Sequence, residues 1–158
     1  PAVPPILEFL EKDDAPFWAV KALRRIVGDD RTVAELLRII DAMEAIFDRD
    51  IKRKVELVSN LREFREPRVR ERLLAFMNDE SEEFRVQAVQ GLAEMGQEEM
   101  APVLVDRMLD ENETQRVRTE ILNLLIDKKW RIRHRKDQVR KSIPSTFWVD
   151  DVGVIHRR

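Results

Sequence analysis

Residues 84–96, Phe-Arg-Val-Gln-Ala-Val-Gln-Gly-Leu-Ala-Glu-Met-Gly, decide the fold of this chain. Val86, Val89, Leu92 and Met95 recur every three residues, a spacing that places them on one face of a helix. Gly96 follows the last of them, at a place where glycine commonly ends a helix. The stretch therefore predicts an amphipathic helix whose apolar face needs a neighbour to cover it.

Copies of this helix occur elsewhere in the chain. Residues 88–95 align with residues 19–26 and 57–64, and more loosely with residues 121–125. The leucines that anchor the four copies follow one another at spacings of 38, 31 and 33 residues, and they are Leu23, Leu61, Leu92 and Leu125. A recurrence of this length is typical of repeat proteins.

A second helix repeats as well. Residues 73–80 match residues 104–111 at an offset of 31. Two helices in each period indicate that stacked neighbours, rather than one pair alone, build the core. The breaks between helices are short, such as residues 28–32, and short loops make neighbouring helices antiparallel. We expect an all-α fold, a right-handed α-solenoid of about four stacked antiparallel helix pairs.

Composition narrows the possible functions. The chain has no cysteine, which excludes disulfides, thiolate nucleophiles and cysteine-bound metals, and which is compatible with the cytoplasmic location that we expect. No apolar run is long enough to cross a membrane. The two histidines, His134 and His156, lie among arginines and show no metal-ligand spacing. Neither a glycine-rich phosphate loop nor a nucleophile motif is present. We therefore expect no catalytic residues, no metal and no cofactor.

The stretch from Phe84 to Gly96, together with Ala101-Pro102-Val103-Leu104 and Asp110, resembles HEAT-type repeats, in particular the short repeats also found in phycobilisome lyases. The resemblance covers roughly residues 5–127. It also includes an aspartate followed six residues later by a base, in the pairs Asp79/Arg85, Asp48/Lys54 and Asp110/Arg116. The resemblance implies that these residues form a ladder between stacked repeats.

Charge is unevenly placed along the chain. Residues 1–127 carry 19 Lys and Arg against 28 Asp and Glu, a net charge of −9, whereas residues 128–158 carry 10 against 3, a net charge of +7. Residues 132–141 are expected to form a short helix, and two β-prone runs after Pro144 are expected to form a hairpin or an extended arm. We therefore divide the chain into a HEAT-like repeat domain, residues 1–130, and a basic C-terminal helix with a capping tail, residues 131–158.

The basic segment is the main candidate binding site. Its cations could be solvated, could bind an acidic protein or the chain's own acidic repeats, or could bind nucleic acid with Trp130 stacking on a base. Trp148 is expected either to cap the last repeat or to anchor a partner. The inner helices add two arginines among charges of mixed sign. The candidate residues are Lys128, Lys129, Trp130, Arg131, Arg133, Arg135, Lys136, Trp148, Arg70 and Arg107.

We expect a non-enzymatic scaffold that binds another protein or peptide and does not enter a membrane. The alternative is a nucleic-acid-binding helical-repeat protein that uses the basic C-terminal segment. A third class, an accessory enzyme resembling bilin lyases, is compatible with the family resemblance. Phe17 and Trp18 are expected to pack inside the first repeat.

Overall fold

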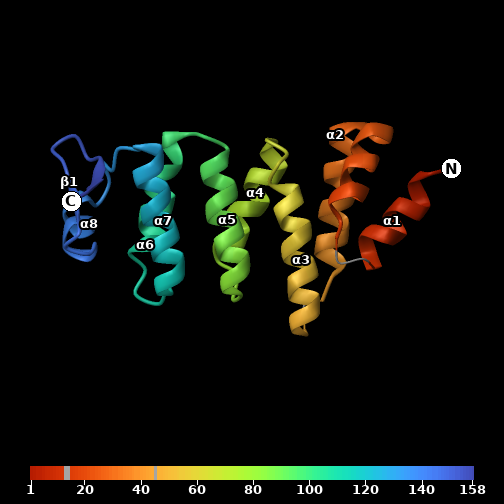
Figure 1. The fold of residues 1–158 in the computed structure, drawn as a ribbon, viewed down its shortest axis with the longest axis horizontal. Helices are drawn as coiled ribbons and strands as arrows, with labels where there is room; N and C mark the ends of the chain where they lie inside the picture. Colours follow the sequence, from red (N-terminus) through yellow and green to blue (C-terminus); the bar gives the residue numbers. More distant parts are fainter. Residues whose placement is uncertain (13–14, 45) are drawn as a thin grey trace. The chain divides into compact units, whose positions relative to one another are not determined.

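The computed structural model describes residues 1–12, 15–44 and 46–158, and within them it is helical apart from one small hairpin (Figure 1). Its contacts divide the chain into two compact units, Pro1–Arg72 and Leu73–Arg158. The division proposed from the sequence at residue 130 stays a prediction.

The first unit is built from α1 (Val3–Lys12), α2 (Phe17–Ala42), α3 (Asp48–Leu61) and the first residues of α4 (Pro67–Phe76). α2 packs against both α1 and α3. The turn expected at residues 28–32 is a break within α2, because Gly28 has a φ of 81° and leaves the helical region. Leu23, before the break, and Leu61, on α3, are fully buried as the repeat alignment predicts.

One expectation in this unit is wrong. Trp18 is 73% exposed and Phe17 is 40% exposed, so neither ring lies in the core. Both residues stand in the first turn of α2, where Ala19, Val20 and Leu23 form the buried face instead. The Lys21 ammonium lies over both rings, 4.4 Å from the centroid of Phe17 and 5.4 Å from that of Trp18. Asp13 and Asp14, which have no base six residues later and so depart from the aspartate–base pattern, lie outside the described residues.

The second unit continues α4 and holds α5 (Glu82–Glu94), a short 3-10 turn η1 (Glu98–Met100), α6 (Ala101–Met108) and α7 (Gln115–Lys128). α7 packs against both α5 and α6. Its core contains the two remaining anchor leucines, Leu92 and Leu125, together with Leu104 and Ile121, and all four are fully buried. One helix pair alone could not cover the apolar faces that carry these residues. Stacked helix pairs cover them, as in other repeat proteins.

The chain ends in α8 (Lys136–Ser142) and a hairpin of β1 (Phe147–Val149) and β2 (Ile155–Arg157), which pair antiparallel with Trp148 opposite His156. Of the two forms expected after Pro144, a hairpin or an extended arm, this pairing shows the hairpin. β2 contacts α7, and α8 contacts β1. We call residues 130–158 the C-terminal cap. They follow α7 in the chain, at the place where a further repeat would have its second helix.

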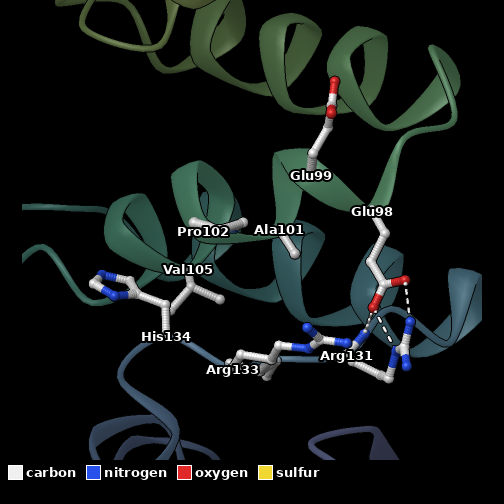
Figure 2. Close-up of a pocket in the computed structure, with 9 residues that line it drawn as sticks. Glu98, Glu99, Ala101, Pro102, Val105, Arg131, Arg133 and His134 are labelled. Atoms are coloured by element: carbon white, nitrogen blue, oxygen red, sulfur yellow. Dashed lines mark hydrogen bonds and ion pairs between the residues drawn. The ribbon is translucent and has the colours of Figure 1, made fainter.

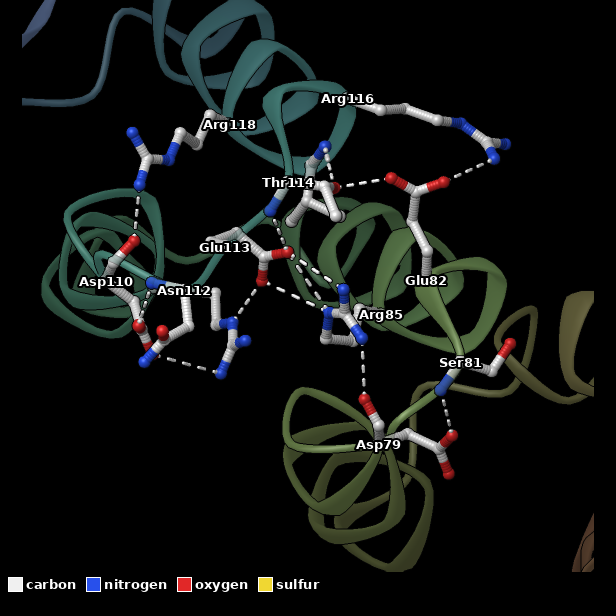
Figure 3. A network of polar contacts seen from close by, with 12 residues as sticks. Asp79, Ser81, Glu82, Arg85, Asp110, Asn112, Glu113, Thr114, Arg116 and Arg118 are labelled. Atoms are coloured by element: carbon white, nitrogen blue, oxygen red, sulfur yellow. Dashed lines mark hydrogen bonds and ion pairs between the residues drawn. The ribbon is translucent and has the colours of Figure 1, made fainter.

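The ladder between repeats differs in detail from the expected pairs (Figure 3). Arg85 donates to the main-chain oxygens of Asp79 at 2.8 Å and Glu80 at 2.9 Å, not to the Asp79 carboxylate. Arg118 makes the equivalent bonds to Asp110, at 2.6 Å, and Glu111, at 3.3 Å. The partner of the turn at Asp110 is therefore Arg118 and not Arg116.

Loop length explains this correction. Asp79 and Asp110 each accept a main-chain N–H two residues later, from Ser81 and Asn112, so the two turns are equivalent. The helix after the first turn starts directly after Ser81, whereas the next one starts after Thr114, two residues later in the alignment. Arg116 instead pairs with Glu82 and Glu83. In the first unit Lys54 donates to the main-chain oxygen of Met43 at 3.3 Å.

Candidate functional site

A shallow groove lies between α4 and α6 in the second unit. Its volume is about 370 Å³, and it is lined by Leu74, Met77, Asn78, Val103, Asp106, Arg107 and Asp110. Apolar side chains from both helices form part of the lining, and polar groups form the rest. Of the two inner arginines proposed from the sequence, Arg107 lines this groove, whereas Arg70 lies half-buried on the part of α4 that belongs to the first unit.

The charges of the groove are compensated within the protein. Arg107 donates to the carboxylate of Glu113 and lies 3.6 Å from that of Asp110. Asp106 accepts hydrogen bonds from His134 at 2.9 Å and Arg135 at 3.0 Å. Burial raises the pKa of Asp106, but the bonds from Arg135 and His134 outweigh it and hold the pKa below the ordinary value. The groove therefore offers apolar contact without a strong field of one sign.

The basic segment 128–136 belongs to the second unit, where residues 131–134 lie beside η1 and the start of α6 (Figure 2). Arg131 donates from Nε to Oε1 of Glu98 at 2.8 Å and from its main-chain nitrogen to the same oxygen at 3.0 Å. These bonds from Arg131, with the nearby charge of Arg133, lower the pKa of Glu98. A cavity of about 320 Å³ lies here, between the start of α6 and residues 131–134.

Other members of the candidate set are placed differently. Trp130 is only 7% exposed, and this corrects the idea that its ring stacks on a base or a partner. Lys136 donates to the main-chain oxygen of Asp151 at 2.5 Å, and Arg135 also donates to Gln138. Three exposed cations have no ion-pair partner within the described ranges of the chain, namely Lys128, Lys129 and Arg133. The segment is thus less cationic in the folded chain than its composition indicates.

Trp148 lies on the outer side of the hairpin. Its ring is 44% exposed and stacks on His156, with 4.8 Å between ring centroids. His156 in turn lies 2.8 Å from the Asp150 carboxylate, a contact that lowers the pKa of Asp150. The buried side chains of the C-terminal cap are other ones, Trp130, Ile132, Val139, Val149 and Ile155. Trp148 therefore keeps a face available for contact.

Sequence reasoning missed a third cavity, of about 290 Å³, between α7 and the C-terminal cap. Arg118, Thr119 and Asn123 contribute to it from α7, and Ile143 and Phe147 contribute from the cap. No periodicity in the sequence places residues 142–147 against α7, so this cavity could be found only from the tertiary structure.

The described residues contain neither a metal-binding cluster of side chains nor a membrane-spanning helix. Residues 1–12, 15–44 and 46–158 contain no cluster of three or more His, Asp or Glu side chains able to hold a metal ion. No helix in those ranges is long and apolar enough to cross a membrane.

Stacked helix pairs, repeated turns and a ladder of arginines define a helical-repeat protein. The sequence profile described as HEAT repeats matches residues 40–126, which is more than half of the chain. The chain belongs to the HEAT-repeat family, and the predicted all-α fold of solenoid type is confirmed. No curated protein and no solved structure matches the chain significantly.

The attachment of the basic segment is expected to weaken in acid. The Asp106 pKa is lowered in the folded chain, so its bonds to His134 and Arg135 stabilise the cap above the unfolded-state pKa and are lost as the pH falls through the folded pKa. Hydrogen exchange measures this loss at the Ile132 amide, which donates to Gly153 within the cap. Its protection factor should fall between about pH 7 and about pH 3. An Asp106→Asn variant should show a smaller dependence, the remainder coming from Glu98 and Asp150, and an equal dependence in both proteins would contradict the prediction.

Proposed function

We propose that this protein is a non-enzymatic scaffold that binds a partner protein in the groove between α4 and α6. HEAT repeats generally serve as protein-interaction scaffolds. We choose this surface because of the composition of the groove. Leu74, Met77 and Val103 lie there beside charged groups that are already paired. Such a surface gains affinity by covering apolar side chains, as the centres of protein interfaces do.

Photo-crosslinking tests this proposal. Asn78 is exposed at the groove, and Gln97 is exposed outside its lining. With p-benzoylphenylalanine at position 78, a defined partner should be captured, whereas the same group at position 97 should not capture it. The charge substitution Val103→Glu should then weaken binding of the purified partner about tenfold or more, because it places a carboxylate where apolar contact is expected. Equal capture at both positions, or an unchanged affinity of Val103→Glu, would refute the groove.

Nucleic-acid binding is the alternative, and the ion pairs of the basic segment argue against it. Phosphate binding depends on protein cations that neutralise phosphates and so release the counterions of the nucleic acid, and here Arg131 and Arg135 are already paired with Glu98 and Asp106. We expect short single- and double-stranded DNA and RNA to show no binding by fluorescence anisotropy at about 150 mM salt. The double variant Glu98→Gln with Asp106→Asn should bind more tightly at about 50 mM salt. Clear micromolar binding by the unmodified chain that weakens with salt would favour the alternative.

A further inference from the structure

The cavity between α7 and the C-terminal cap, which we call the end pocket, has apolar walls. Met108 and Leu122 come from the repeats, and Ile143, Pro144 and Phe147 come from the cap. Its volume of about 290 Å³ lies near the lower end of the range typical of ligand pockets, about 300 Å³. The space suits one bulky apolar side chain better than a large cofactor.

One edge of the end pocket is a line of uncharged polar groups. Gln115, Thr119 and Asn123 are spaced four residues apart, so they lie along one face of α7. Amide side chains both donate and accept hydrogen bonds, which matches the alternating N–H and C=O groups of a peptide main chain. This edge can therefore hold the backbone of a bound segment whose side chain enters the pocket.

The charge at the end pocket has one sign. Arg118 lines it, and its Nη2 atom donates to the main-chain oxygens of Asp110 and Glu111. Its Nε atom is buried without a hydrogen-bond partner. Arg157 donates to Asn123 of the lining at 3.4 Å, and neither arginine has a carboxylate partner among the described residues. No Asp or Glu lines the pocket. A ligand that brings a carboxylate would supply the missing counter-charge.

We propose that the end pocket binds a segment of a partner protein in which a bulky apolar side chain lies beside one or more carboxylates. The apolar walls take the side chain, the polar edge of α7 takes the main chain, and Arg118 and Arg157 face the acidic groups. This inference rests on the proposed role in protein binding, but it concerns a surface separate from the groove between α4 and α6 and names the chemistry of its partner.

Three fluorescein-labelled hexapeptides test the end pocket by fluorescence anisotropy. The first has Leu-Phe flanked by glutamates, the second has Leu-Phe flanked by lysines, and the third has Gly-Ser flanked by glutamates. The first should bind with a dissociation constant on the order of 10–100 μM. The other two should bind about tenfold more weakly or not at all, since each lacks one of the two features. Equal binding of the first and second peptides would refute the charge assignment.

Two variants locate the site. Thr119 is exposed, so Thr119→Trp should fold normally while filling the pocket, and the first peptide should lose about tenfold or more in affinity. Gln97→Trp adds the same ring at an exposed position outside the pocket and should leave binding unchanged. Arg157→Gln should weaken binding about threefold, as expected for one exposed charge contact. Undiminished binding by Thr119→Trp would overturn the proposal. Val103 does not line the end pocket, so the Val103→Glu experiment tests the groove alone. A negative result with the peptides can therefore be distinguished from a negative result for the groove.

Discussion

Replacing Glu113 with alanine is expected to lower the free energy of unfolding by about 3–5 kcal/mol, the usual cost of removing one partner from a buried ion pair. Glu113 is 6% exposed and Arg85 is 7% exposed. The carboxylate accepts bonds from Arg85 Nη2 at 3.0 Å, from Arg107, and from the main-chain nitrogen of Thr114 at 2.7 Å. Arg85 lies on α5 and Arg107 on α6, so one carboxylate links two helices to the start of α7. Without it, Arg85 loses its counter-charge and Arg107 keeps only the Asp110 carboxylate, at 3.6 Å.

Urea denaturation measures this effect, and the same loop supplies a control. Glu111 is exposed two residues earlier, so Glu111→Ala should change the free energy of unfolding by about 0.5 kcal/mol or less. Similar losses in the two variants would contradict the role assigned to Glu113.

The pH dependence of stability gives a second readout for Glu113. Burial raises its pKa, but the bonds from Arg107, Thr114 and Arg85 outweigh burial and lower the pKa below the ordinary value. The contribution of the folded carboxylate is therefore present above the unfolded-state pKa and disappears as the pH falls through the folded pKa. The stability of Glu113→Ala should accordingly fall less steeply in acid than that of the unmodified chain.

Replacing Gly153 with alanine is expected to detach the hairpin of the C-terminal cap. The amide of Ile132 donates to the main-chain oxygen of Gly153 at 2.8 Å, which brings the two backbones together. A Cβ at Gly153 would lie 2.3 Å from the main-chain oxygen of Ile132, and Gly153 has a φ of 98°. Left-handed backbone costs a residue with a side chain about 1–2 kcal/mol, and overpacking costs about 1–3 kcal/mol more. We expect a loss of about 3 kcal/mol in the stability of the cap.

A substitution at Gly96 separates the cost of the left-handed backbone from the cost of overpacking. Gly96 has a φ of 80°, but the nearest atom to its Cβ position would be the main-chain oxygen of Glu94 at 3.7 Å, an ordinary contact. Gly96→Ala should therefore cost only the conformational part, about 1–2 kcal/mol. Limited proteolysis near residues 142–147 and the fluorescence of the buried Trp130 report release of the cap. Urea denaturation compares the total loss in the two variants, and equal losses would show that the contact with Ile132 does not hold the cap.

The repeat architecture could be predicted from the sequence because each helix pair buries the same kind of residue at the same position. All four anchor leucines, at 23, 61, 92 and 125, are fully buried, since equivalent positions on stacked helices face the core of their own unit. The hairpin was predictable for a related reason, because two short β-prone runs flank a turn that contains Gly153. Local patterns of this kind depend on neighbours within a few residues.

The candidate site depends on contacts far apart in the sequence, and there the predictions were less accurate. Trp130 stands within the basic run, yet it is buried, because the chain turns there into the core of the cap. Arg131 and Arg135 find their carboxylates at Glu98 and Asp106, about 30 residues away. The end pocket is lined by α7 and by residues 142–147, and no spacing in the sequence predicts that these segments lie together.

The equivalent turns at Asp79 and Asp110 have a consequence for how such a chain can change in length. Each turn is closed by the same N–H bond to an aspartate, and each presents two carbonyls to an arginine in the first turns of the next helix. The residues between them, 80–110, therefore begin and end in the same local geometry. Recombination at these two points would insert or remove one whole helix pair, and each junction created would keep an aspartate that closes the turn and two carbonyls that face an arginine of the next helix.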